Sequence, residues 1–175
     1  MKALIFAAGL GTRLRPLTDN RPKALVEVAG RPMLEHVIRH LISYGFTDIV
    51  VNIHHFGQQI VDFLRDNGNF GVNIQVSDER GELLDTGETR PEGFVPSASQ
   101  LQLAFGGVHV ISPTVFDALA GYTDAHKFSI TPFYVDMCRR LKIMGYIPDT
   151  AYRWFDIGSP EKLAQAEAAI TGSQQ

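Results

Sequence analysis

The chain has 175 residues, 45% of them hydrophobic, and carries a formal net charge of −3 with a pI near 6.0. This length can bury a real core, so we expect one globular domain, while the acidic balance excludes the broad basic field of a nucleic-acid-binding protein. No apolar run is long enough to span a membrane. The single cysteine, Cys138, can form no intramolecular disulfide, and glycines and arginines follow the N-terminus too soon for a signal peptide. We therefore expect a cytoplasmic protein.

The first expected element is an apolar strand that ends in a glycine turn. Residues Lys2–Ala8 form a short apolar run, which predicts a strand buried on both faces. Gly9 and Gly11 then allow a tight turn whose N–H groups can face phosphate oxygens without a Cβ in the way. Arg13 offers a planar charged fork, and Lys23 can return to the phosphates as a point charge. Four cations follow the turn within eleven positions: Arg13, Arg15, Arg21 and Lys23. The segment predicts a site for a nucleoside triphosphate.

Two better-known phosphate motifs do not fit this turn. The dinucleotide-binding fingerprint requires a third glycine where this chain has Leu14. The Walker A loop requires Gly-Lys-Ser/Thr, which occurs nowhere in the sequence. The remaining alternative is an ordinary Gly-rich turn followed by solvated arginines. The full pattern Ala-Ala-Gly-x-Gly-Thr-Arg-Leu-x-Pro-x-Thr, with Pro-Lys after it, favours phosphate binding over that alternative.

Helices and strands alternate after the glycine turn. We expect helices over 31–45 and Gly57–Asn67, and strands over Asp48–His54 and Gly71–Ser77. Alternation of this kind implies right-handed crossovers and a mainly parallel sheet, with ligands bound beyond the carboxyl ends of the strands. Gly9–Arg13 falls at such an end. In the first of these helices, five apolar residues recur at helical spacing: Leu34, Val37, Ile38, Leu41 and Ile42.

The later half of the chain is less regular. We expect a loop over Glu88–Gln102, a strand over Leu103–Ser112 and a helix over Pro132–Leu141. The last helix should begin after Ser159, an N-cap residue, with Pro160 at its first position.

Asp156 is the main candidate acid outside the glycine turn. It follows Trp154 and Phe155, which would partly desolvate it, and a divalent cation would offset that cost. Mg²⁺ takes one or two carboxylates together with substrate phosphates and waters. From position alone, a salt bridge or a charge at a helix N-terminus explains Asp156 equally well. His36 and His40 lie four apart on a predicted helix, but they indicate a solvated face because no third ligand is near in sequence.

The opening string resembles the signature of the sugar-1-phosphate nucleotidyltransferases, and within that family the short bacterial enzymes that transfer uridylyl or guanylyl groups. The similarity is close over 1–87 and resumes over about 103–170. It implies a three-layer α/β/α Rossmann-like fold with a mainly parallel mixed sheet. It also implies Mg²⁺ bound by Asp156 within Phe-Asp-Ile-Gly, and catalysis by Arg13 and Lys23 on the phosphates. The implied nucleotide-binding residues are Ala7, Ala8, Gly9, Gly11, Thr12, Arg13 and Gly87, and the implied sugar-binding residues are Phe105, Gly106 and Gly107.

The resemblance implies that the substrates are a nucleoside triphosphate and a sugar 1-phosphate, and the products a nucleotide sugar for the cell envelope and diphosphate. Leu83–Gly87 resembles the end of the base-recognition loop and favours uridylyl or guanylyl transfer. Two alternatives stay open. One is a cytidylyltransferase acting on a phospho-alcohol such as phosphocholine, and the other is a non-catalytic regulatory subunit that senses nucleotide sugars. The oligomeric state is not defined, and a homo-oligomer stays open.

The resemblance is interrupted between about 87 and 103. Relatives continue there into a helix and then a central strand that ends in the other metal-binding aspartate. The chain is therefore interpreted as a single nucleotidyltransferase domain over 1–175 that lacks several dozen middle residues. Either these residues belong to the gene product but not to this sequence, or the product is truncated and inactive, or another segment substitutes. The good match of both flanks favours the first explanation.

Overall fold

The computed structural model describes residues 2–78, 109–123, 130–144 and 155–172. The chain divides into two compact units, one made of Met1–Leu84 with Phe155–Gln175 and the other of Asp85–Trp154. The first unit contains both the glycine turn and Asp156, although these lie far apart in sequence. The interpretation of 1–175 as one domain without its middle segment stays a prediction.

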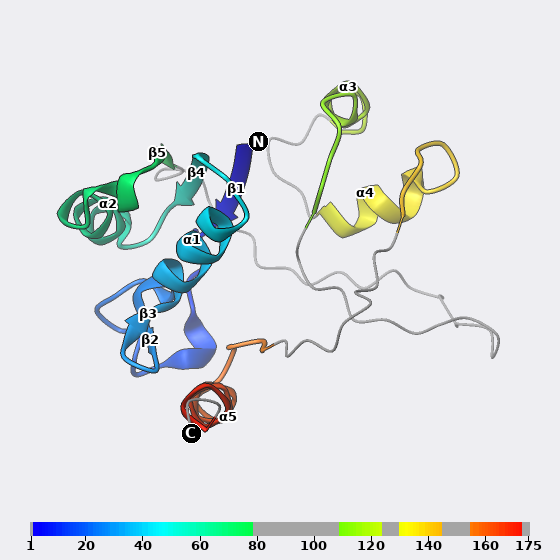
Figure 1. The fold of residues 1–175 in the computed structure, drawn as a ribbon. Coiled ribbons are helices and arrows are strands. Elements are labelled where there is room, and N and C mark those ends of the chain that lie inside the picture. The colour runs from blue at the N-terminus through cyan, green and yellow to red at the C-terminus, as the bar shows by residue number, and fades with distance from the viewer. Residues whose placement is uncertain (1, 79–108, 124–129, 145–154, 173–175) are drawn as a thin grey trace. The chain divides into compact units, whose positions relative to one another are not determined.

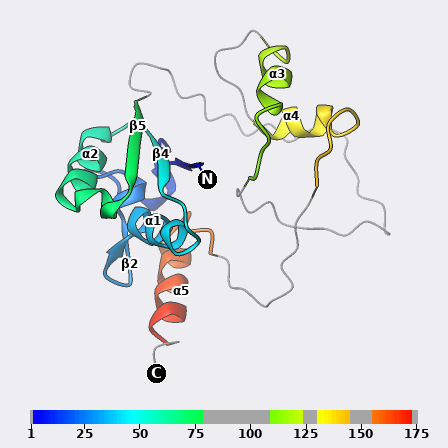
Figure 2. The same ribbon diagram turned by 45° about the horizontal axis from the view of Figure 1, so that its top comes forward.

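A parallel three-stranded sheet forms the centre of the first unit. Its strands are β1 (Lys2–Phe6), β4 (Asp48–Ile53) and β5 (Asn73–Asp78), in the order β1-β4-β5. Helix α1 (Met33–Ser43) connects β1 to β4, and α2 (Gly57–Asp66) connects β4 to β5 (Figures 1 and 2). Both crossovers advance in the same direction across the sheet, so right-handed connections place both helices on one face. The α/β class and the parallel sheet are confirmed.

The hydrophobic core lies between these two helices and one face of the sheet. Its buried members are Ala7, Leu34, Ile38, Ile49, Val51, Ile53, Ile60 and Leu64. Ala3 and Ile5 of β1 pack against this core, while Leu4 and Phe6 point to the other face and are 53% and 71% exposed. The prediction that the first strand is buried on both faces is therefore wrong. Alternate residues of a strand face opposite ways, and both helices cover the side of Ala3 and Ile5.

The predicted elements of this unit are confirmed within a few residues, with one correction on α1, at His36. Val37, one of the five apolar residues at helical spacing, is 43% exposed, so it does not share the buried face of the helix. His36 is half-buried, and its Nε2 lies 2.9 Å from the carbonyl oxygen of Val28, so it does not belong to a solvated face. The helix begins after Pro32 and ends at Ser43. The turn that follows it contains Gly45, which has a φ of 80°. Between α2 and β5 the chain makes a short 3-10 turn, η3 (Gly68–Gly71).

The C-terminal helix packs against the segment that follows the glycine turn. That segment contains the 3-10 turns η1 (Thr12–Leu14) and η2 (Lys23–Leu25) and the antiparallel pair β2 (Glu27–Val28) and β3 (Arg31–Pro32). Helix α5 (Pro160–Thr171) buries two residues against them, in a second cluster made of Val26, Val28, Leu163 and Ala166. As predicted, the Ser159 side chain caps this helix, accepting a hydrogen bond from the Lys162 N–H at 3.4 Å.

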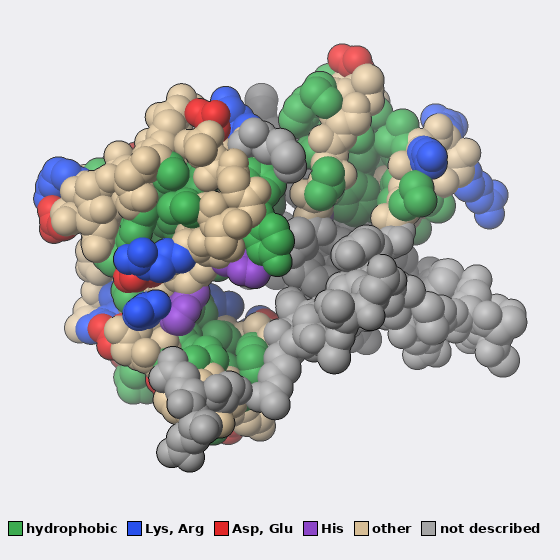
Figure 3. Space-filling model, in the orientation of Figure 1, with side chains coloured by type: hydrophobic (Ala, Val, Ile, Leu, Met, Phe, Trp, Pro, Cys, Tyr) green, Lys and Arg blue, Asp and Glu red, His purple; other side chains and the backbone are tan. Residues whose placement is uncertain are grey.

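The second unit contributes two helices among its described residues. They are α3 (Val115–Ala120) and α4 (Ile130–Met137), the second ending before the predicted Leu141. Phe133 is fully buried there, while Phe116 is 57% exposed, and Figure 3 shows hydrophobic side chains at the surface of both helices. Residues 109–112 are not a strand, and the rest of that predicted strand and the predicted loop lie outside the described residues. Within the described part of the chain, no helix combines the length and apolar character needed to cross a membrane.

Candidate nucleotide-binding site

A buried asparagine, Asn52, hydrogen-bonds the backbone at Ala7, where the chain leaves the sheet. The Ala7 N–H donates to the Asn52 Oδ1 at 2.7 Å and also lies 3.2 Å from the Asn52 carbonyl oxygen. Asn52, on β4, is only 7% exposed, so its amide is held inside the fold and fixes where β1 ends. Ala7 and Ala8 are both buried beneath the turn. The sequence analysis missed Asn52, although a polar residue inside the apolar run Ile-Val-Val-Asn-Ile was a usable signal.

The glycine turn closes on the loop that follows it. Gly11 adopts the left-handed conformation with a φ of 66°, and a Cβ there would lie 2.9 Å from the Lys23 Cβ and 3.0 Å from the Thr18 Cγ2. The buried Thr18 hydroxyl donates to the Gly11 carbonyl oxygen at 2.9 Å, and the Leu14 N–H donates to the same oxygen. In contrast, none of the described residues has an atom within 4 Å of where a Gly9 Cβ would lie. Glycine at position 11 thus brings Lys23 against the turn, while the described residues leave the space beside Gly9 open.

Asp156 is brought to the cations of the turn by the segment before α5. A Cβ on Gly158 would lie 3.4 Å from the Arg13 Cζ, so the Arg13 guanidinium rests against this glycine. The Asp156 Oδ2 accepts from the Lys162 Nζ at 3.1 Å, and the Asp156 side chain is 40% exposed. The salt bridge that the sequence left open as an alternative is therefore present in this structure.

The pKa shifts at this site show that the charged groups act on one another. The hydrogen bond from Lys162 is the largest influence lowering the pKa of Asp156 below its ordinary value, and the charges of Lys162, Lys23 and Arg13 act the same way. Burial lowers the pKa of Lys23, and the charge of Arg13 adds to this, while Asp156 opposes it. Because Asp156 offsets only part of the effect of burial, an incoming anion would further stabilise the charged form of Lys23.

The balance of charge favours a polyanion over a free cation. Among the described residues, the cations Arg13, Lys23 and Lys162 all act on the carboxylate of Asp156. In the part of the chain that the structure describes, no three His, Cys, Asp or Glu side chains come together in a way that could hold a metal ion. The turn can add backbone N–H groups around Gly9, where open space remains.

The structure gathers eight of the residues that the sequence analysis assigned to the site in one unit, and four others lie outside the described residues. The first group comprises Ala7, Ala8, Gly9, Gly11, Thr12, Arg13, Lys23 and Asp156. The second comprises Gly87, Phe105, Gly106 and Gly107. Thr18 is a further residue that the sequence analysis did not assign, although the Pro-x-Thr pattern contains it.

Comparison with known proteins identifies the family. A model of the nucleotidyl transferase family matches residues 2–92, so the chain belongs to that family, as its opening string predicted. It is 46% identical over 87 residues to N-acetylmuramate alpha-1-phosphate uridylyltransferase of Caulobacter vibrioides, covering 49% of this chain and 36% of that protein. It is 37% identical over 127 residues to mannose-1-phosphate guanyltransferase of Kluyveromyces lactis, covering 72% and 35%.

A third relative carries a different activity in its name. The choline-phosphate cytidylyltransferase of Streptococcus pneumoniae is 44% identical over 79 residues, covering 45% of this chain and 33% of that protein. The chain thus spans about a third of the length of each of these relatives.

Proposed function

We propose that this protein transfers a nucleotidyl group from a nucleoside triphosphate to a sugar 1-phosphate. The observation that carries the proposal is the gathering of Arg13, Lys23 and Asp156 beside the glycine turn. An oxygen of the sugar phosphate attacks the α-phosphorus and forms a new P–O bond. The bond from the α-phosphorus to the oxygen that bridges to the β-phosphorus breaks, and diphosphate leaves with that electron pair. A sugar phosphate has a second pKa of about 6, so it is already ionised near neutral pH and needs no general base.

The protein's part in this reaction is alignment and charge neutralisation. The N–H groups of the turn around Gly9 and Gly11 hold phosphate oxygens, and Arg13 binds two of them with its planar fork. Lys23 stabilises the charge that develops as diphosphate leaves. Its lowered pKa reflects a cation that is partly removed from water, which strengthens its interaction with phosphate.

Asp156 is the residue that would hold Mg²⁺. One carboxylate together with substrate phosphates satisfies the ligand needs of this ion, and the 40% exposure of Asp156 leaves it accessible. When bound, the ion supplies positive charge to the phosphoryl oxygens of the reacting nucleotide. By resemblance, Gly87 approaches the base and Phe105–Gly107 lie under the sugar. The name of the Caulobacter relative suggests N-acetylmuramate 1-phosphate as acceptor. We further propose that the product serves the cell envelope and that the reaction takes place in the cytoplasm.

Diphosphate release from the purified full-length gene product tests the proposal. UTP, GTP, CTP and dTTP are each paired with N-acetylmuramate 1-phosphate or mannose 1-phosphate in the presence of Mg²⁺. We expect Arg13→Gln to lower kcat/KM by about 100-fold or more, the size of loss seen when a charge-stabilising donor is removed. Arg15→Gln is the matched control, because Arg15 pairs with Asp19 at 3.4 Å and is largely exposed. Equal losses in both variants, or no turnover with any pair, would contradict the proposal.

A second candidate is cytidylyl transfer to phosphocholine, which the streptococcal relative favours. The same assay includes CTP with phosphocholine. Turnover with that pair alone would show that the acceptor is a phospho-alcohol and not a sugar 1-phosphate. A regulatory subunit is distinguished by binding of a nucleotide sugar without Mg²⁺-dependent turnover.

A further inference from the structure

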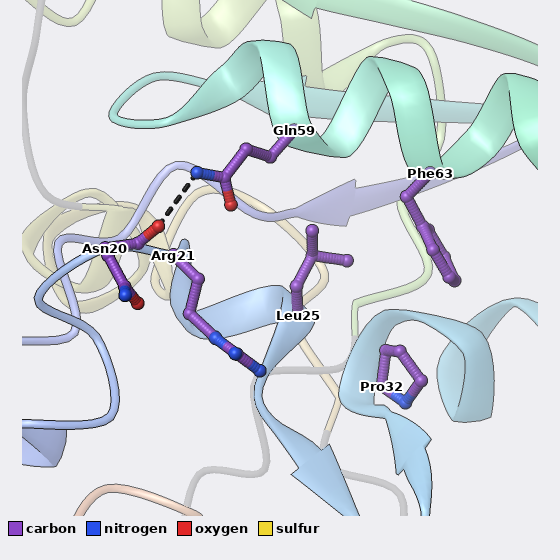
Figure 4. Close-up of a pocket in the computed structure, with 6 residues that line it drawn as sticks. All are labelled: Asn20, Arg21, Leu25, Pro32, Gln59 and Phe63. Carbon is purple, nitrogen blue, oxygen red and sulfur yellow. Dashed lines mark hydrogen bonds between the residues drawn. The ribbon is translucent and has the colours of Figure 1, made fainter.

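The first unit contains an open pocket on the side of η2 and α2. It has a volume of about 320 Å³ and is lined by Asn20, Arg21, Leu25, Pro32, Gln59 and Phe63 (Figure 4). These residues come from the loop after Thr18, from η2, from the end of β3 and from α2. None of them is among the individual nucleotide-binding residues that the resemblance implies, although Arg21 is one of the four cations of the segment after the glycine turn. A volume near 300 Å³ lies at the lower end of the range for small-molecule sites.

Arg21 gives this pocket a positive charge that the described residues leave uncompensated. Three described arginines of the first unit are paired with nearby carboxylates: Arg15 with Asp19, Arg39 with Glu35, and Arg65 with Asp62 and Asp66. Arg21 is in none of the ion pairs among the described residues. A guanidinium with free donors at the wall of a pocket is suited to an oxyanion, which it can bind with two parallel hydrogen bonds.

Away from Arg21, the pocket is lined by the apolar side chains of Leu25, Pro32 and Phe63. Figure 4 shows Phe63 extending from α2 toward Pro32, with Leu25 between them and Arg21. The Phe63 ring is held by a tilted contact with the Phe70 ring, at 5.8 Å between centroids. Aromatic rings that pack in this way offer a flat surface to a second ring.

The two sides of the pocket are tied together by one hydrogen bond. The Gln59 Nε2 on α2 donates to the Asn20 carbonyl oxygen at 2.8 Å, as the dashed line in Figure 4 marks. This bond fixes the loop that bears Arg21 relative to the helix that bears Phe63. The bond therefore holds the backbone beside Arg21 close to α2 before a ligand arrives, which reduces the entropy lost on binding.

We propose that this pocket binds a small molecule that carries a planar apolar ring and one oxyanion group, phosphate or carboxylate. The ring packs on Phe63 and Pro32, and the oxyanion accepts hydrogen bonds from Arg21. This site is separate from the nucleotide site and does not depend on the proposed function, because a ligand can bind here whether or not the chain turns over nucleotides.

Titration of the full isotope-labelled chain by nuclear magnetic resonance tests the proposal, with phenyl phosphate and benzoate as probes. At least one probe should bind saturably and shift the signals of the Arg21 Nε–H and the Gln59 side-chain amide. Inorganic phosphate, which lacks the ring, should bind at least about tenfold more weakly. Arg21→Gln should lower the affinity for the probe by about tenfold or more, and Arg15→Gln should leave this affinity unchanged. Comparison of the two probes decides between phosphate and carboxylate.

Two further variants separate this site from the nucleotide site and from general unfolding. Phe63→Leu keeps most of the apolar volume, so the chain should fold. Because the substitution removes the flat ring, it should lower the affinity for the probe. Arg13→Gln should leave that affinity unchanged. Loss of probe binding in Arg13→Gln but not in Arg21→Gln would place the probe at the nucleotide site and overturn the proposal. The absence of saturation by either probe up to about 10 mM would also overturn it.

Discussion

Replacing Gly11 by alanine should destabilise the protein through two separate effects. The first is conformational: with a φ of 66°, the residue is in the left-handed region, which costs an L-residue about 1–2 kcal/mol. The second is steric, because the new Cβ would lie 2.9 Å from the Lys23 Cβ and 3.0 Å from the Thr18 Cγ2. Neither neighbour can easily move away. The Lys23 Cβ is attached directly to the backbone, and Thr18 is 4% exposed and hydrogen-bonded to Gly11.

The magnitude follows from adding these two effects. Overpacking at a site that cannot relax costs about 1–3 kcal/mol, so we expect Gly11→Ala to lower the free energy of unfolding by about 2–5 kcal/mol in total. Native domains are stable by about 5–15 kcal/mol, so this loss would be a large fraction of the total. Urea denaturation followed by far-ultraviolet circular dichroism measures it.

Two other glycines provide matched controls for the same substitution. Gly45 has a φ of 80° but nothing within 4 Å of its Cβ position, so Gly45→Ala should show the conformational cost alone, about 1–2 kcal/mol. Gly9 has neither a positive φ nor a close neighbour, so Gly9→Ala should change the stability by about 0.5 kcal/mol or less. If Gly11→Ala cost no more than Gly45→Ala, the close packing of the turn against Lys23 would be refuted.

Four further predictions concern the site and its support. Gly9→Ala should weaken nucleotide binding by about tenfold or more in calorimetric titration, because its Cβ would enter the open space where phosphates are proposed to bind. Nucleotide affinity should fall as the pH rises through the pKa of Lys23, which burial lowers, and Lys23→Arg should remove this dependence because a guanidinium stays charged. Asp156→Asn should abolish Mg²⁺-dependent turnover yet tighten binding of metal-free nucleotide, because it removes a negative charge that lies near Arg13 and Lys23. Leu163→Ala should lower the free energy of unfolding in urea by about 2–4 kcal/mol, because Leu163 is only 8% exposed and holds α5 in place.

Local pattern was sufficient to predict the helices and the sheet strands of the first unit, but not the short β2–β3 pair or the 3-10 turns. Apolar spacing in α1 and α2 and the apolar runs of β1 and β4 specify their own type of structure, and Ser159 marks the start of α5 by its capping chemistry. The glycines of the turn could also be interpreted locally, because their conformational freedom is a property of the residue itself.

Contacts between distant segments could not be predicted in this way. Whether Leu4 and Phe6 are buried depends on what covers the second face of the sheet, and nothing within β1 specifies that. The placement of Asp156 near Arg13 depends on the packing of Leu163 against Val28, which join segments more than a hundred residues apart. The resemblance supplied this pairing, whereas composition and periodicity did not.

The charges around Asp156 also bear on how the site would acquire Mg²⁺. Lys162 holds one carboxylate oxygen at 3.1 Å, and Arg13 and Lys23 contribute two more positive charges that act on the same group. A free divalent cation therefore meets a region where positive charge exceeds negative charge, and its attraction to Asp156 is largely offset. A bound triphosphate would reverse this balance, because it would neutralise Arg13 and Lys23 and bring oxygens that could bind the ion directly. If the nucleotide binds as proposed, the arrangement of these residues would favour entry of the metal together with the nucleotide, with Lys162 paired to the Asp156 carboxylate until then.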